Sequence, residues 1–141
     1  MISLRLPLVA TALALSACAA DYDPPATPVA LPPEPGKPVL QRETVTVSAF
    51  LVGASSSLAE LNTARCEIAR GGRTVTITTP MMLSIPVHAG AQAPLDIDCS
   101  AQIGPRLARA KLRHLPETAN ADPADTATRH YPKQITIRFR Q

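Results

Sequence analysis

The chain has 141 residues, of which 45% are hydrophobic and 18% are charged, and its formal net charge is +3. This length allows one small domain with terminal segments, and so modest a positive charge does not suit a nucleic-acid-binding protein. Aromatic residues make up only 3% of the chain and tryptophan is absent, so the core has to be aliphatic and the aromatic platforms on which sugars or bases stack are scarce.

Residues 1–17 are predicted to be a secretory signal peptide. Arg5 is the only charge in this segment, and a short apolar run from Leu6 to Leu15 follows it. A permanent membrane-spanning helix needs about 20 apolar residues, so this run is too short to be one. A positive start, a short apolar stretch and small residues at the end are typical of a cleaved signal.

The signal ends in Leu15-Ser16-Ala17-Cys18, which resembles the lipobox of bacterial lipoproteins. The resemblance implies that Cys18 is acylated with palmitate-like chains and becomes the first residue of the mature protein. Two or more such chains anchor a protein stably, where one does not. Ala19 follows the cysteine where an inner-membrane lipoprotein of enteric bacteria would have aspartate. We therefore expect the outer membrane, facing the periplasm, with the periplasmic leaflet of the inner membrane as the alternative. Ordinary cleavage after Ala17 or Ala19 would instead leave Cys18 as a free thiol.

Residues 18–38 are predicted to be a linker, because seven prolines lie between Asp21 and Pro38. Proline has a fixed φ and no N–H donor, which excludes a helix or a central strand. An extended polyproline-like spacer spans about 3.1 Å per residue, or roughly 55 Å for the segment from Asp21 to Pro38. A proline-rich docking motif for a partner groove is the alternative interpretation.

Residues 39–141 are predicted to form the folded domain, an all-β, small antiparallel sandwich of immunoglobulin-like size with about seven strands. Alternating apolar and polar residues predict most of the strands, and no alternation of strands with helices appears. Ser57 and Glu60 have the spacing of a capping box, so 56–62 is expected to be a short helix or a loop. Longer loops are expected at 88–94 and 115–130. The predicted strands are 44–52, 64–70, 73–78, 82–87, 95–101, 106–113 and 134–140.

Cys66 and Cys99 both lie within predicted strands, on the same side as the apolar neighbours Ile68 and Ile97. Beyond the signal peptide the compartment is oxidising, so we expect a structural disulfide between them. The alternatives are metal ligands, which favour closer spacing and nearby histidines, and a redox pair, which favours Cys-x-x-Cys.

The stretch from Cys66 to Ile137 resembles a group of small Gram-negative envelope lipoproteins. These proteins carry a Cys…Thr-Pro…Leu-x-Val-x-Cys core and end in a Tyr-Pro strand, but this chain lacks their glycine-rich segment. The resemblance implies a disulfide-bearing β-sandwich lipoprotein and carries no known reaction. The matching motifs are Cys66, Gly71-Gly72, Thr78-Thr79-Pro80, Leu95-x-Ile97-x-Cys99 and Tyr131-Pro132.

Few residues suggest catalysis. Asp96 and Asp98 share one strand face and are interpreted as a solvated face rather than as paired catalytic carboxylates. His88, His114 and His130 are spread along the chain and are interpreted as surface histidines. We therefore expect no enzyme, no metal and no cofactor. A small metal-dependent or hydrolytic envelope enzyme built on these residues is the alternative.

A basic surface is the feature that favours binding. Arg109, Lys111 and Arg113 lie on one face of a predicted strand, and Arg138 and Arg140 share a face of the last strand. If the two strands are neighbours, they form one basic face that suits peptidoglycan carboxylates, anionic lipid headgroups or an acidic envelope protein. A solubilising outer face is the alternative. The sequence thus predicts a lipid-anchored, non-catalytic binding or structural lipoprotein of the cell envelope.

Overall fold

The computed structural model describes residues 27–117 and 129–141. Residues 1–26 and 118–128 lie outside the described residues; they hold the predicted signal, Cys18, and most of the predicted 115–130 loop. The described residues contain no helix, and no helix among them is long and apolar enough to cross a membrane. The nine described strands are β1 (Val29–Ala30), β2 (Gln41–Val52), β3 (Leu58–Glu60), β4 (Arg65–Arg70), β5 (Arg73–Thr78), β6 (Met81–Val87), β7 (Leu95–Ile103), β8 (Arg106–His114) and β9 (Gln134–Arg140).

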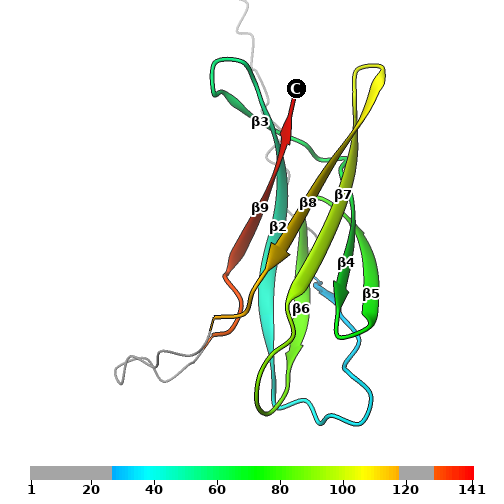
Figure 1. The fold of residues 1–141 in the computed structure, drawn as a ribbon, viewed down its shortest axis with the longest axis vertical. Coiled ribbons are helices and arrows are strands. Elements are labelled where there is room, and N and C mark those ends of the chain that lie inside the picture. Colours follow the sequence, from blue (N-terminus) through cyan, green and yellow to red (C-terminus); the bar gives the residue numbers. More distant parts are fainter. Residues whose placement is uncertain (1–26, 118–128) are drawn as a thin grey trace, which may run out of the picture.

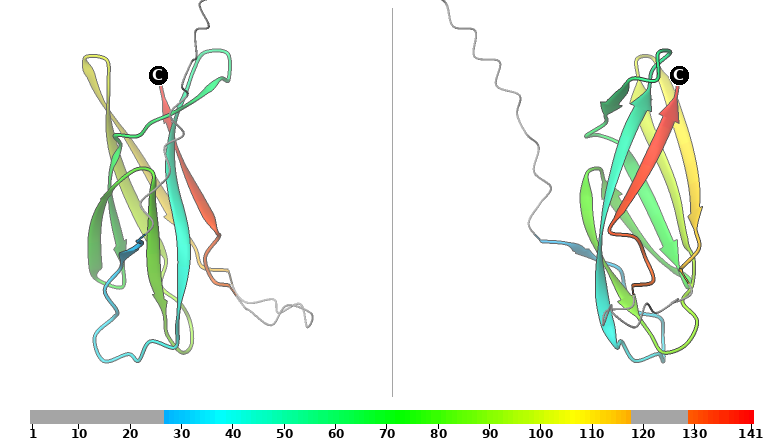
Figure 2. Two further views of the ribbon diagram at one scale, coloured as in Figure 1. Left: turned by 180° about the vertical axis from the view of Figure 1, so that it is seen from behind. Right: turned by 90° about the vertical axis from the view of Figure 1, so that its left-hand side faces the viewer.

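The strands form two sheets that pack face to face as a sandwich (Figures 1 and 2). The first sheet has the order β1-β6-β2-β3, and β9 also pairs with β2; the second has the order β5-β4-β7-β8. The pairings β1–β6 and β2–β9 are parallel, and the other described pairings are antiparallel. The prediction of a small all-β sandwich is confirmed, with nine strands instead of about seven.

The core is aliphatic, as the composition requires. On β7 the side chains at every second position are buried, and the burial alternates in the same way along β9. Tyr131 and Phe139 are the largest fully buried side chains in the described part of the chain. Because most inward positions of both sheets are apolar, removing their surface from water is the main force that holds the sandwich together.

Residues 56–62 do not form the expected short helix or loop, because Leu58–Glu60 is the strand β3. It pairs antiparallel with Phe50–Val52 of β2. The turn between them is closed by the Gly53 N–H, which donates to the Ser57 carbonyl over 2.9 Å, and Ser56 adopts a positive φ of 60°. Pairing with β2 therefore prevails over the local capping signal of Ser57 and Glu60.

The folded domain includes at least residues 29–38, so the expected linker boundary after Pro38 lies too far along the chain. We call residues 31–38 the strap. Leu31 at its start is completely buried, and its N–H donates to the Ser84 carbonyl over 2.9 Å. The strap passes so close to the β4–β5 turn that a Cβ on Gly71 would lie 2.6 Å from the Glu34 side chain. Gly71 also has a positive φ of 53°, so glycine is favoured there on both grounds.

The predicted disulfide between Cys66 and Cys99 is present. The two residues are direct cross-strand partners on β4 and β7, with their Cα atoms 4.0 Å apart. Both side chains are completely buried. The bond therefore links the two central strands of the second sheet from within the core.

Candidate functional site

The predicted basic row lies on the outer face of the second sheet. Arg109, Lys111 and Arg113 of β8 point away from the core and are exposed. The register of β7 and β8 places Asp98 opposite Lys111 and Asp96 opposite Arg113. The charged atoms are 3.1 Å apart in the first pair and 3.6 Å apart in the second. Exposed pairs such as these contribute only about 0–1 kcal/mol each to stability.

On the outer face of the second sheet, the acidic residues of β7 form one column and the basic residues of β8 form the next. Glu67 on β4 lies beside Asp98 in the register, and Arg65 lies beside Ser100. A shallow depression runs between the acidic and basic columns, and the charged residues lining it are Glu67, Asp96, Asp98, Lys111 and Arg113. Asp96 and Asp98 thus act as ion-pair partners of β8 in this structure.

Arg138 and Arg140 do not extend the basic row within one sheet. They lie on β9, which belongs to the first sheet because it pairs with β2. The single face expected from two neighbouring strands is therefore not formed. The strands β8 and β9 instead contact each other across the two sheets along one side of the sandwich. A hollow of about 270 Å³ opens there, and its lining includes Arg106, Leu107 and Arg140.

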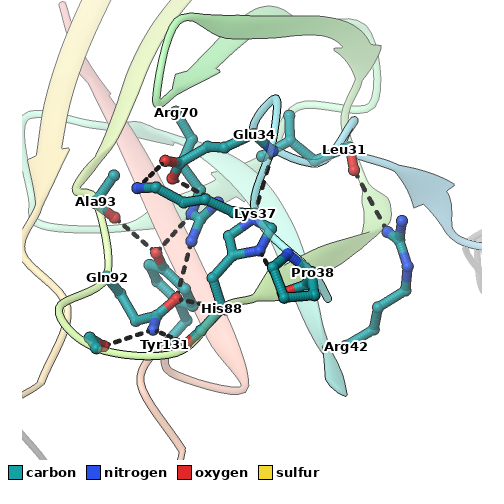
Figure 3. A network of polar contacts seen from close by, with 11 residues as sticks. Leu31, Glu34, Lys37, Pro38, Arg42, Arg70, His88, Gln92, Ala93 and Tyr131 are labelled. Carbon is teal, nitrogen blue, oxygen red and sulfur yellow. Dashed lines mark hydrogen bonds and ion pairs between the residues drawn. The ribbon is translucent and has the colours of Figure 1, made fainter. Parts of the chain in front are cut away.

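A second cluster is a network of polar side chains under the strap (Figure 3). At its centre is Arg70, the last residue of β4, which is only 2% exposed. Its Nε donates to the Tyr131 hydroxyl over 2.7 Å, and its Nη2 donates to the Gln92 side-chain oxygen over 2.9 Å. Its Nη1 is 3.4 Å from the Glu34 carboxylate. The Tyr131 hydroxyl in turn donates to the Ala93 carbonyl over 2.6 Å.

This network shifts two pKa values. The hydrogen bond from Lys37, helped by the charges of Lys37 and Arg70, holds the pKa of the Glu34 carboxyl below its usual value, although partial burial opposes the shift. Burial raises the pKa of the Tyr131 phenol, although Arg70 opposes this shift. The first shift favours the ionised form of Glu34, and the second favours the neutral form of Tyr131.

His88 also belongs to the network and holds the second half of the strap at two points. Its Nδ1 is 3.0 Å from the Pro38 carbonyl, which can only accept, so Nδ1 carries the proton. Its Nε2 accepts a hydrogen bond of 3.3 Å from the Glu34 N–H. Both ring nitrogens are thus used within the fold, and His88 is buried instead of lying on the surface as expected.

The other two histidines lie near Tyr131. The His114 ring is tilted against the Tyr131 ring with 6.5 Å between centroids, and the His130 N–H donates to the Glu43 carboxylate over 2.9 Å. Within residues 27–117 and 129–141, no group of three or more histidine, cysteine or acidic side chains is placed to hold a metal ion.

Sequence reasoning missed the network around Arg70, although one signal was present. Arg70 falls on the same side of β4 as the buried residues Cys66 and Ile68, which indicates a charged side chain pointing into the core. Glu43 gives the same signal on β2, where it shares a side with Val45 and is buried. Buried charges of this kind require partners, and here the partners come from distant loops.

Comparison with known proteins finds no matching family model, no matching curated protein and no matching solved structure.

Proposed function

We propose that this protein is a lipid-anchored, non-catalytic binding lipoprotein of the bacterial envelope. Cys18 carries the acyl chains at the outer membrane, and the sandwich faces the periplasm; the periplasmic leaflet of the inner membrane is the alternative location. Its partners belong to the class that suits exposed cations: peptidoglycan, anionic lipid or an acidic envelope protein.

The observation that supports this proposal is which of the three cysteines form the disulfide bond. The chain has three, and two of them, Cys66 and Cys99, are joined to each other in the core. Cys18 is the one cysteine outside that bond, and it ends the lipobox-like motif. A buried disulfide also suits a protein that folds in an oxidising compartment, which is where a lipoprotein of this class resides.

Binding is favoured over catalysis because the polar side chains considered for catalysis are engaged in contacts within the domain. The two carboxylates considered for catalysis, Asp96 and Asp98, form ion pairs with β8. Both ring nitrogens of His88 hold the strap. The cations of β8 remain exposed on an outer surface, where a partner can reach them.

Mass spectrometry of the mature protein tests the anchor directly. We expect the N-terminal peptide of protein isolated from cells to begin at Cys18 and to carry acyl mass. Replacing Cys18 with serine should abolish palmitate labelling and move the protein from the detergent phase to the aqueous phase. The matched control is the double variant Cys66→Ala and Cys99→Ala, which should keep its label. A mature chain that begins after Ala17 or Ala19 without acyl mass would contradict the proposal.

A further inference from the structure

Within residues 27–117 and 129–141, no strand covers one long edge of the second sheet. The strand β8 pairs with β7 in an unbroken register from Arg106 to His114, and it pairs with no other strand in the described part of the chain. It has nine residues and contains neither a proline nor a bulge. Edge strands are usually protected by shortness, proline, bulges or charge, and β8 has only charge.

The register shows which backbone groups of β8 face outward. Opposite residues of an antiparallel pair are about 4.5 Å apart at Cα when they do not exchange hydrogen bonds and about 5.5 Å apart when they do. The Cys66–Cys99 separation of 4.0 Å marks a pair of the first kind, so the N–H and C=O of Cys99 point to β8 and bond Ala110. The alternate residues of β8 therefore turn their N–H and C=O to the free side: Leu107, Arg109, Lys111 and Arg113.

The inner face of β8 is also incompletely covered. Leu112 has the same parity as Ala108 and Ala110, which pack against the core, yet it is 38% exposed. Its cross-strand partner Ile97 on β7 is only 2% exposed. The first sheet therefore does not extend over this end of β8. One further strand beside β8 would cover apolar surface on this side.

The charge along this edge is positive. Its four cations are Arg106, Arg109, Lys111 and Arg113, and described ion pairs engage only the last two. Arg140 of β9 joins Arg106 around the hollow at the same side of the sandwich. Two copies paired through β8 would place these cations side by side, which is destabilising, so the charge disfavours a second copy of this chain.

We propose that β8 is a docking strand for an extended acidic segment of another envelope protein, which adds to the second sheet by main-chain hydrogen bonds. Alternate side chains of such a segment point to opposite faces. Acidic side chains on the outer face meet Arg109 and Lys111, and apolar side chains on the inner face cover Leu112. A row of outward N–H and C=O groups is matched by a polypeptide and not by a lipid headgroup or a glycan. This interface deepens the proposed binding function but does not depend on acylation of Cys18.

The probe is a fluorescent peptide of nine alternating glutamate and valine residues, the length of β8. It is titrated into the protein purified from cells in a neutral detergent. We expect saturable binding that weakens with added salt because the contact is partly ionic. The same peptide with lysine in place of glutamate should not bind. Methylating the alternate peptide nitrogens that face β8 should abolish binding by the unaltered protein, and methylating the other set should not.

A matched pair of variants separates main-chain pairing from charge. Both Lys111→Ala and Lys111→Pro remove the cation, but only proline also removes the outward N–H of β8. Proline is tolerated on an edge strand when its nitrogen faces solvent, so both variants should keep the far-ultraviolet circular dichroism of the native protein. We expect Lys111→Pro to bind the acidic peptide at least about tenfold more weakly than Lys111→Ala, since the pairing that holds the backbone is interrupted.

Three results would overturn the docking strand. The first is no saturable binding of the acidic peptide, and the second is equal affinity of the two Lys111 variants together with peptide binding that methylation does not change. The third is sedimentation of the protein as a dimer formed through β8. Binding to anionic vesicles that falls equally in both variants, without peptide binding, would make the edge a charged membrane contact instead. Any of these outcomes leaves the acyl mass on Cys18 unaffected, so the interface and the anchor fail separately.

Discussion

Replacing Arg70 with methionine tests whether the buried guanidinium holds the strap to the sandwich. Arg70 contacts three side chains, those of Glu34, Gln92 and Tyr131. Methionine keeps an unbranched apolar side chain at this position but lacks the guanidinium and offers no donor, so all three contacts are lost at once.

The expected loss of stability depends on which hydrogen bonds and ion pairs each partner of Arg70 retains in the variant. The Tyr131 hydroxyl still donates to the Ala93 carbonyl, and Gln92 still donates to the carbonyls of His88 and Gly90. Glu34 loses its buried cation but keeps Lys37. Breaking a buried ion pair by removing one partner costs about 3–5 kcal/mol, and since no partner is left wholly unpaired we expect about 3 kcal/mol.

The assay is urea unfolding of the mature protein at neutral pH, followed by circular dichroism. The control is Arg73→Met, because Arg73 lies directly opposite Arg70 in the β4–β5 hairpin but is exposed. Surface substitutions of this kind usually change stability by no more than about 0.5 kcal/mol. If Arg70→Met were as stable as the unaltered protein, or if both variants lost the same stability, the network would not be what secures the strap.

Three further predictions concern stability. The double variant Cys66→Ala and Cys99→Ala opens a loop with a sequence separation of 33 and should lose about 3–4 kcal/mol in urea unfolding; a loss below 1 kcal/mol would argue against the bond as a main stabiliser. The pKa of Glu34 is lowered by Lys37 and Arg70, so its contribution is present above its ordinary pKa of 4.5 and is lost as the pH falls through the lower folded value. Glu34→Gln should therefore flatten the acid side of a stability–pH curve, and an unchanged curve would contradict this. Burial raises the pKa of Tyr131 above its ordinary 10.0, so stability should fall as the pH rises beyond that value, less steeply in Tyr131→Phe; equal slopes would count against the shift.

Seven of the strands could be predicted, most of them because they carry their own alternating pattern. The runs that became β7 and β9 alternate over their whole length, and their inward residues are the buried ones. The strands β1 and β3 could not be predicted in this way. They have two and three residues, which is too few for a period, and they exist because they pair with β6 and β2.

The candidate surface was predictable only in part, because the pattern within one strand does not show which strands lie beside it. The period of a strand places Arg109, Lys111 and Arg113 on one face, and they lie on one face. That Asp96 and Asp98 lie opposite two of them follows from the register of β7 against β8, in which Ile103 pairs with Arg106 across a two-residue turn. The assignment of β9 to the other sheet is a matter of topology, since β9 pairs with a strand that begins far earlier in the chain.

The network under the strap required knowledge of long-range contacts. The position of Arg70 on the inward side of β4 is visible in the sequence. Its partner Glu34 comes from a proline-rich segment that has no periodicity, and composition alone made that segment look like a free spacer. Proline removes the N–H donor at four of the eight strap residues but does not prevent the side chains of the strap from packing.

Because the strap belongs to the domain, the chain between a Cys18 anchor and the first strand is short. Val29 already pairs with β6, which leaves only residues 18–28 to bridge the distance. Even fully stretched, so few residues reach no further than about 40 Å. If the acyl chains of Cys18 lie in the bilayer as proposed, the sandwich stays within a thin layer next to the membrane. Any protein that binds it has to come within that layer.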